Sequence, residues 1–409
     1  MRYLRDLMLG VLPFLLAVQG VAWLTFVPGA LRGHSDFRQL YTAGYMVRTG
    51  HAAKLYDYAT QQHFQDSLVA SGDLTLPFIR PAYQALLFVP FSLLSYRAAY
   101  LAFLGANVIL FALAFWLLHA KLTNLAVAWN LLPVFVFLVF YPVALALMQG
   151  QDSVLLLVFL AAALHALERG REATAGALLG LGLFKLQIVI PIALIFLLWR
   201  RWRFTGGFAL SGLLLALISI WTVGLAQIWL FVRSMLSVGG VAGNQVAFPL
   251  RVSIMANLRG LIFGLTSSWL SPAAMQVVIF LASAAVLIAV VIFVPRTLCP
   301  ENRFILAITA SVIVSYYLFI HDLSVMLIPI ALVLNRYLGS QTPDNPLSRF
   351  TAWTAALLLV APMCIFLMPG HFYLIALALG AFMVMLILVA RGESTAVAPT
   401  PAFSGEVHG

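Results

Sequence analysis

Charged residues are scarce in this sequence. Only 9% of its 409 residues are Asp, Glu, Lys or Arg, whereas 63% are hydrophobic, and the mean hydropathy is +1.03. Apolar runs long enough to cross a bilayer, each about 20 residues at the helical rise, recur from end to end. A backbone in lipid must satisfy its hydrogen bonds internally, so the composition excludes an ordinary soluble domain and predicts an all-α polytopic membrane protein.

Cysteine is nearly absent, and familiar soluble-enzyme motifs are missing. Cys299 and Cys364 lie in unlike surroundings, so no disulfide framework is expected. The sequence has no P-loop, no His/Cys metal spacing, no G-x-S-x-G elbow and no G-x-G-x-x-G after a strand. Soluble nucleotide or metal chemistry has no visible place here, and we expect a site that uses no metal and no cofactor.

Acidic residues are the minority among the charges. The 23 Lys and Arg residues exceed the 13 Asp and Glu residues, giving a formal net charge of +10. In a membrane protein such an excess reports basic cytoplasmic loops, and no nucleic-acid motif accompanies it, so no nucleic-acid partner is expected. With the basic connections placed inside, about 12 transmembrane helices with both termini inside is the simplest arrangement.

Ten apolar segments are expected to span the membrane: 7–27, 97–119, 124–147, 151–168, 205–224, 273–295, 304–320, 323–335, 350–368 and 372–390. The first segment, 7–27, is too long for the apolar core of a signal peptide, so we expect it to be a retained membrane anchor. Residues 174–199 form either one long helix or two short helices that meet near Lys185. Arginines on both sides of this stretch favour a hairpin with Lys185 near its tip, because short basic loops stay cytoplasmic.

One long outer connection, 28–96, is expected to hold helices that lie against the outer membrane surface. Ser35 is a plausible N-cap for a first helix that stops at Gly50, and a second runs from about Tyr58 to Val69. A third lies between the prolines of 81–90.

The domain organisation follows from these segments. Residues 1–391 are expected to form a single membrane domain, with 225–272 as its second outer connection. Residues 392–409 are polar and small, so we expect a disordered cytoplasmic tail.

Asp36 is the strongest candidate for catalysis on the outer side. It precedes the first surface helix, and a carboxylate kept ionised at the mouth of a membrane cavity could accept a proton from a hydroxyl. The same position also suits a helix-capping aspartate.

Other polar residues fall at the same membrane boundary. His321 and Asp322 separate two apolar runs and form either a substrate contact or a polar turn. The stretch 148–153, MQGQDS, places Gln149, Gln151 and Asp152 where they could bind sugar hydroxyls, or is a turn in which Asp152 or Ser153 caps the next helix.

Two cations could hold a phosphate group. Lys185 and Arg80 offer charge-assisted donors on the outer side. A lysine at mid-membrane is costly unless it faces a wet cavity or a partner. Arg80 also fits a side chain that extends from the bilayer to the interface.

Four stretches in chain order carry a resemblance to a known family: SDFRQLYTAGYMVRTGHAAKLYD, RPAYQALLFVPFSLLS, the run 148–203 that begins MQGQDS, and YYLFIHDLSVMLIPIAL. The sequence resembles glycosyltransferase family 87, a bacterial membrane family of the GT-C type that includes polyprenol-phosphate-mannose-dependent mannosyltransferases. The most telling matches are D-F-x-x-x-Y-x-A-G, which contains Asp36 and Tyr41, and G-x-x-x-G-L-x-x-x-K, which ends at Lys185.

The resemblance implies a GT-C-like bundle in the bacterial inner membrane whose active site faces the periplasm. It implies a single displacement that moves a sugar, with mannose the expected one, from a polyprenyl-phosphate donor to a hydroxyl of a lipid or glycan acceptor. Asp36 would be the general base, and Lys185 and Arg80 would bind the donor phosphate. The remaining candidates are substrate-binding residues: Tyr41, Gln149, Gln151, Asp152, His321 and Asp322.

A transporter or flippase of lipid-linked saccharides is the main alternative. Transporter charges sit near the midplane on discontinuous helices, often in repeated halves. The 174–199 hairpin suits that class, whereas most polar candidates lie at one membrane boundary and no internal repeat is evident.

Overall fold

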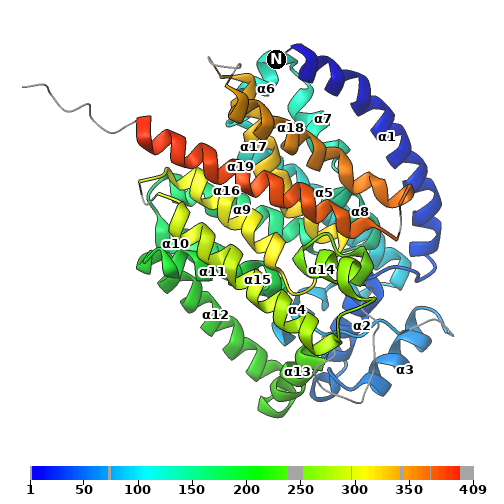
Figure 1. Cartoon of the computed structure of the whole chain (residues 1–409). Coiled ribbons are helices and arrows are strands. Elements are labelled where there is room, and N and C mark those ends of the chain that lie inside the picture. The colour runs from blue at the N-terminus through cyan, green and yellow to red at the C-terminus, as the bar shows by residue number, and fades with distance from the viewer. Residues whose placement is uncertain are drawn as a thin grey trace, which may run out of the picture.

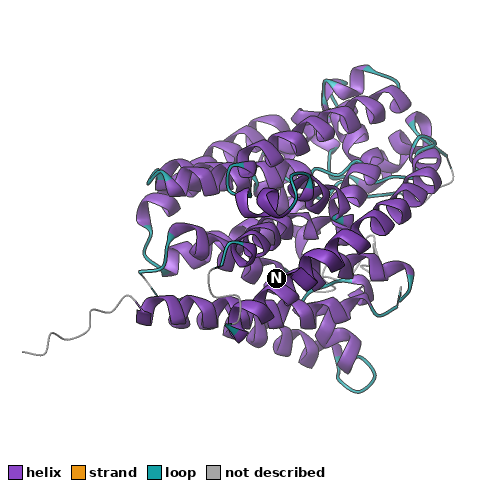
Figure 2. Ribbon diagram, turned by 90° about the horizontal axis from the view of Figure 1, so that it is seen from above, coloured by secondary structure: helices purple, strands orange, loops and turns teal. Residues whose placement is uncertain are grey.

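A computed structural model describes residues 2–71, 75–237, 252–295, 297–340, 345–368 and 370–396. These residues form helices joined by loops, and no strand occurs among them (Figure 2). The expected all-α class is therefore confirmed. Residues 392–396 of the expected tail continue the last helix and are not disordered. Residues 397–409 of that tail and residues 238–251 of the second outer connection lie outside the described ranges.

Seven helices in the described ranges are long and apolar enough to cross a membrane, or nine if each of two bent pairs is one span. The expected count of about 12 is not confirmed. Four of these spans are single helices: α1 (Arg2–Ala30), α5 (Tyr96–His119), α12 (Trp202–Val223) and α15 (Pro272–Phe293). Each of the other three combines an α-helix with a short 3-10 helix: α17 (Leu327–Leu338) with η5 (Ile320–Met326), α18 (Pro346–Val360) with η6 (Ala361–Phe366), and α19 (Ile375–Ala396) with η7 (Phe372–Leu374).

Two apolar runs differ from the expected spans. The run 124–147 is divided into α6 (Thr123–Ala128), α7 (Leu132–Val139) and α8 (Tyr141–Gln149), and the last two are bent by 55°. Pro142 explains this bend, because proline has no backbone N–H and starts a helix more readily than it continues one.

The second difference lies at 304–320, where α16 (Pro300–Val314) stops six residues short of the expected end. His321 and Asp322 consequently lie on η5 rather than in a turn between two spans.

The segment around Lys185 returns on itself, as the hairpin alternative predicts. It comprises α10 (Glu172–Leu181), η3 (Leu183–Lys185) and α11 (Leu186–Leu198). Gly176 lies against Phe204 and Gly180 against Ser211, so α10 and α12 run side by side in the same direction. Because α10 and α12 run in the same direction, the chain between them must return to the level at which α10 starts, and α11 makes this return.

Glycine fixes how closely α10 and α12 approach. A Cβ added at Gly176 would lie 1.8 Å from the Phe204 carbonyl oxygen, and one at Gly207 would lie 1.9 Å from that of Ala173. Small residues spaced by four allow such backbone contact between membrane helices. The packing sets the height of α10, and with it the position of Lys185 at the tip.

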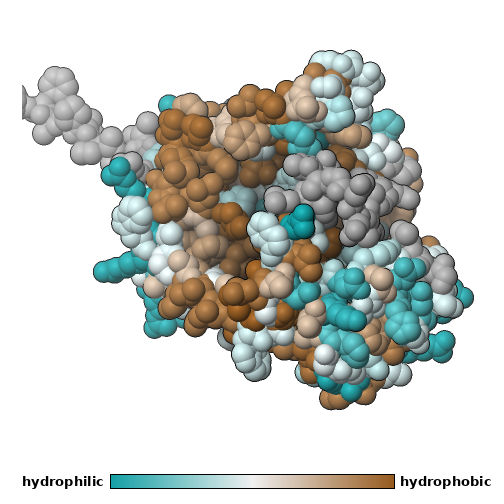
Figure 3. All heavy atoms as spheres, turned by 90° about the horizontal axis from the view of Figure 1, so that it is seen from below, coloured by the Kyte–Doolittle hydropathy of each residue, from teal (hydrophilic) through white to brown (hydrophobic). Residues whose placement is uncertain are grey.

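Five of the shorter helices lie away from the N-terminus, toward the opposite end of the molecule (Figure 1). They are α2 (Phe37–Arg48), α3 (Tyr58–Leu68), α4 (Ala82–Phe88), α13 (Leu225–Ser237) and α14 (Leu258–Thr266). Figure 3 shows this end from below, with hydrophilic residues concentrated on one side of it and apolar residues over much of the rest.

The helices expected at 58–69 and within 81–90 are present as α3 and α4, but the expected cap of the first helix is wrong. The residue before α2 is Asp36, and its side chain makes no capping bond. Ser35 instead directs its hydroxyl to Tyr96, 2.9 Å from the phenol oxygen.

Candidate active site

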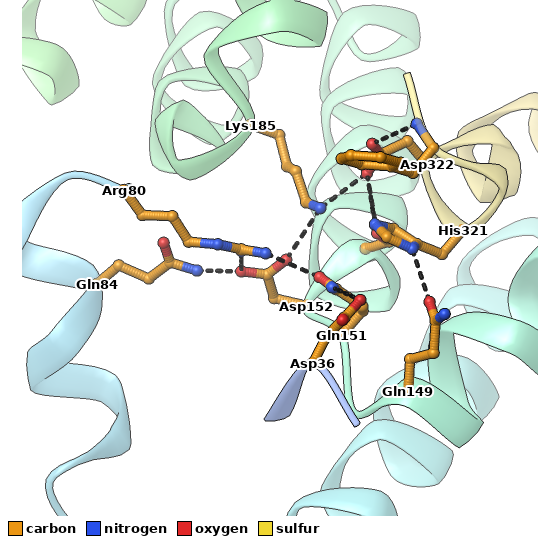
Figure 4. A network of polar contacts seen from close by, with 11 residues as sticks. Asp36, Arg80, Gln84, Gln149, Gln151, Asp152, Lys185, His321 and Asp322 are labelled. Carbon is orange, nitrogen blue, oxygen red and sulfur yellow. Dashed lines mark hydrogen bonds and ion pairs between the residues drawn. The ribbon is translucent and has the colours of Figure 1, made fainter. Parts of the chain in front are cut away.

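Polar side chains from five separate parts of the chain meet in one network (Figure 4). The loop before α2 brings Asp36, the loop before α4 brings Arg80, and η3 brings Lys185. The end of α8 and its connection to α9 (Ser153–Glu168) bring Gln149, Gln151 and Asp152, and η5 brings His321 and Asp322. A cavity of about 280 Å³ lies beside them.

The α8–α9 connection depends on a glycine. Gly150 has φ +61°, a left-handed conformation that suits glycine at the end of a helix. A Cβ at this position would also lie 2.7 Å from Cβ of Phe37. The tight turn lets the side chains on either side of Gly150 reach the network, and it packs the turn against the start of α2.

Asp152 joins the two cations. Its carboxylate accepts hydrogen bonds from Arg80 and from Gln84, and Nζ of Lys185 lies 3.4 Å from Oδ1. Burial opposes ionisation of Asp152, but Arg80 and Lys185 outweigh it and hold the pKa of this carboxyl below its usual value. Asp152 is therefore an ionised counter-ion and a poor candidate for a base.

The capping role considered for Asp152 and Ser153 is not what the structure shows. The Asp152 side chain makes no capping hydrogen bond at the start of α9. The Ser153 hydroxyl instead lies 3.3 Å from Oδ1 of Asp322, to which it donates.

Asp322 anchors Lys185 from the other side. Nζ of Lys185 lies 2.7 Å from Oδ1 of Asp322, and the backbone N–H of Phe319 donates to Oδ2 at 3.2 Å. Asp322 is fully buried, so both charges of this pair are shielded from solvent. Lys185 is thus held between two aspartates in a fixed position.

His321 is held by an amide. Its Nδ1 lies 2.8 Å from Oε1 of Gln149, and because an amide oxygen only accepts, Nδ1 carries the proton. Nε2 lies 3.5 Å from Oδ1 of Asp322. The ring also lines the cavity.

Asp36 differs from the other two aspartates. It is half-buried and lines the cavity, and its Oδ2 accepts a hydrogen bond of 2.6 Å from Nε2 of Gln151. Oε1 of Gln151 in turn accepts from Arg80 at 2.8 Å. Within the described ranges no cation lies at ion-pair distance from Asp36, so this carboxyl group is held by an amide hydrogen bond and not by an ion pair.

The cavity has two kinds of wall. Asp36, Arg80, Lys185 and His321 supply the polar wall, while the apolar wall consists of Leu76, Pro77, Ile79, Leu145, Phe184, Met235, Ile254, Phe319 and Ile320. Such a cavity can hold a molecule that carries both an anionic group and a hydrocarbon chain.

Tyr41 is the one expected site residue that is not in this network. Its ring packs beside Phe37, and its hydroxyl donates to the Leu94 carbonyl at 2.9 Å. It belongs to the packing beneath α2. The periodicity that places Tyr41 on one face of the helix does not reveal which way that face points.

Three residues of the site are not recognised from the sequence. Gln84 binds Asp152 and is fully buried, Ser153 binds Asp322, and Tyr317 lines the cavity. The only signal for Gln84 is a single amide in the apolar helix AYQALLF.

Metal ligands are not grouped in the part of the chain that the structure describes. Among those residues no set of three or more His, Cys, Asp and Glu side chains could hold a metal ion.

Comparison with known proteins identifies the family. No curated protein and no solved structure matches the chain. The family model described as glycosyltransferase family 87 matches residues 78–320, more than half of the 409 residues. The matched range contains Arg80, the α8–α9 connection and Lys185, and it ends next to His321. The chain is a member of glycosyltransferase family 87, and thus a glycosyltransferase with several membrane helices.

Proposed function

We propose that this glycosyltransferase transfers a sugar, mannose in the first instance, from a polyprenyl-phosphate donor to a hydroxyl of a lipid or glycan acceptor. The reaction takes place on the periplasmic side of the bacterial inner membrane. Asp36 is the general base, and Arg80 and Lys185 bind the donor phosphate.

One observation carries the proposal. Asp36, the carboxylate of the network without a cation at its side, faces the same cavity as Arg80 and Lys185. A base must keep its lone pair available, whereas a phosphate needs positive charge. The cavity offers both functions to one substrate pair.

The chemistry is a single displacement. The acceptor oxygen attacks the anomeric carbon as its proton passes to Asp36, and the bond from that carbon to the phosphate oxygen breaks. The electron pair leaves with the polyprenyl phosphate, whose additional charge Arg80 and Lys185 stabilise. The product has inverted anomeric configuration, because one displacement exchanges the two sides of the carbon.

The apolar wall suits the lipid part of the donor. Met235 of α13 lines the cavity, while Leu225 and Trp229 of the same helix are 70% and 63% exposed. An amphipathic helix of this kind lies at a membrane interface. We place the entry of the polyprenyl chain beside α13, where the donor can move in from the bilayer.

A transfer assay tests this function. Purified protein in lipid vesicles receives labelled polyprenyl-phosphate mannose and a bacterial membrane-lipid extract, with a nucleotide-activated mannose in a parallel sample. The proposal predicts labelled product from the lipid donor alone, with inverted configuration. Transfer from the nucleotide donor, or retained configuration, contradicts it. Movement of intact donor across the vesicle membrane without any transfer supports the flippase alternative.

A further inference from the structure

A second, basic pocket lies at the end of the molecule opposite the candidate active site. It has a volume of about 200 Å³ and is lined by Trp199, Arg200, Arg201, Pro295 and Arg303. Nη1 of Arg201 lies 3.1 Å from Oε1 of Glu172, which follows the end of α9. Because α9 starts beside Asp152 and has 16 residues, at about 1.5 Å each the pocket is roughly 24 Å from the network.

Two hydrogen-bond donors of this pocket have no acceptor in the part of the chain that the structure describes. Trp199 is only 7% exposed, yet its Nε1 has no partner among those residues, and Nε of Arg303 is also buried without one. Buried polar atoms almost always have a partner, and both of these groups can only donate. The missing partner is therefore an acceptor.

Positive charge is also left unbalanced. Arg201 pairs with Glu172, but among the described residues no carboxylate lies within ion-pair distance of Arg200 or Arg303. Two helices begin at the pocket, α12 at Trp202 and α16 at Pro300. Arginines at the positive ends of helix dipoles are unfavourable, and a bound anion reverses that effect.

Arg200 occupies a conformation that glycine normally takes. Its φ is +59°, and it is the one non-glycine residue of the described chain with positive φ. The backbone N–H of Arg201 bonds to the Phe196 carbonyl at 3.0 Å, which closes the end of α11 as a glycine would. Strained backbone conformations concentrate at functional sites, so an arginine at this position points to a function for its charge.

We propose that this pocket binds a phosphate group. Trp199 Nε1 and Arg303 Nε donate hydrogen bonds to its oxygens, and Arg200 adds charge. Two sources have this chemistry: the headgroup of an anionic phospholipid and free phosphate. Bound there, the phosphate ties the end of α11, whose other end carries Lys185, to the start of α16.

Binding is measured on the full chain in neutral detergent. Short-chain phosphatidylglycerol, inorganic phosphate and short-chain phosphatidylcholine are titrated separately, and the change in unfolding temperature gives each Kd. Trp199→Phe keeps an aromatic side chain but removes the N–H, Arg303→Gln removes the charge, and Arg200→Gly relieves the strained backbone. Arg169→Gln is the matched control, since Arg169 is an exposed arginine outside the pocket.

We expect the wild type and Arg169→Gln to bind phosphatidylglycerol or phosphate but not phosphatidylcholine. The Kd should rise about tenfold in Trp199→Phe and Arg303→Gln. Arg200→Gly should unfold at a higher temperature without ligand and yet bind more weakly, a combination that a purely structural role does not give. Which anion binds identifies the source. No binding by the wild type, or equal Kd values in all variants, overturns the proposal.

Discussion

Lys185 joins two carboxylates that come from distant parts of the chain. Its ammonium group lies between Asp152 and Asp322, and these three side chains are nearly or fully buried. A buried ion pair adds little net stability compared with apolar packing, but removing one partner leaves an uncompensated charge. The role of Lys185 in the reaction must therefore be separated from its role in the fold.

A charge-balanced double variant makes this separation. Lys185→Gln alone leaves Asp322 buried without its cation and should cost about 3–5 kcal/mol of unfolding free energy. Lys185→Gln/Asp322→Asn should recover most of that stability, whereas sugar transfer should stay at least roughly a hundredfold below wild type because the leaving phosphate has lost a cation. Thermal unfolding and kcat are measured on both variants.

Lys121→Gln is the control for that comparison. Lys121 lies near the other end of α9, where its ion pairs with Glu168 and Glu301 are partly exposed, and such pairs contribute about 1 kcal/mol or less. Recovery of transfer in the double variant would remove Lys185 from donor binding.

Asp152 makes stability depend on pH. The pKa of its carboxyl in the folded protein lies below the value of about 3.9 expected when the chain is unfolded. Its contribution is then complete above the unfolded pKa and is lost as the pH falls through the folded pKa. Asp152→Asn should flatten the decline in unfolding temperature below about pH 4. The same decline in the variant as in the wild type would contradict the lowered pKa of Asp152.

At the scale of elements, the contact between α10 and α12 determines where the hairpin tip lies. Backbone atoms meet at Gly176 and Gly207, so this contact cannot be relieved by rotating a side chain. A small change there should act on Lys185 at a distance.

Two neighbouring glycines of α12 test this idea. Gly207→Ala places a methyl group 1.9 Å from the Ala173 carbonyl oxygen and should cost about 1–3 kcal/mol, with a parallel loss of transfer. A Cβ on Gly206 meets nothing within 4 Å, so Gly206→Ala should be neutral or slightly stabilising. Equal unfolding temperatures for the two variants would show that the close contact does not limit stability.

Some elements are predictable from the sequence and others are not. The hairpin follows from arginines on both sides of an apolar run that is too polar at Lys185 for a simple span. The break at Phe140 and the early end of α16 do not follow, because hydropathy is continuous through both. There the path depends on proline geometry and on packing across the bundle.

The candidate site shows the same distinction. Asp36, Arg80 and Lys185 attract attention because a charge beside the membrane is expensive. Gln84 does not, since one amide in an apolar helix carries no such signal. Tyr41 is expected at the site but packs elsewhere. The motif gives the spacing of its residues but not the direction in which each side chain points.

For the whole molecule, the proposal requires that the end carrying α2, α3 and α13 faces the periplasm. Sidedness can be measured by labelling single cysteines. Both native cysteines are exposed and are first replaced by serine. Gln62→Cys on α3 should react with a membrane-impermeant maleimide in intact cells, whereas Arg169→Cys should react only after permeabilisation. The reverse pattern would place the site on the cytoplasmic side.

The central claim is that Asp36 is the base in sugar transfer. The most direct measurement is kcat for polyprenyl-phosphate mannose in Asp36→Asn, with Asp57→Asn as control. Asp57 is an aspartate of the same outer connection that caps α3 through Thr60, a role that asparagine also performs. We predict that Asp36→Asn lowers kcat about 10²–10⁴-fold while the unfolding temperature and donor binding stay near wild type, and that Asp57→Asn keeps full activity. Wild-type kcat in folded Asp36→Asn would contradict the account.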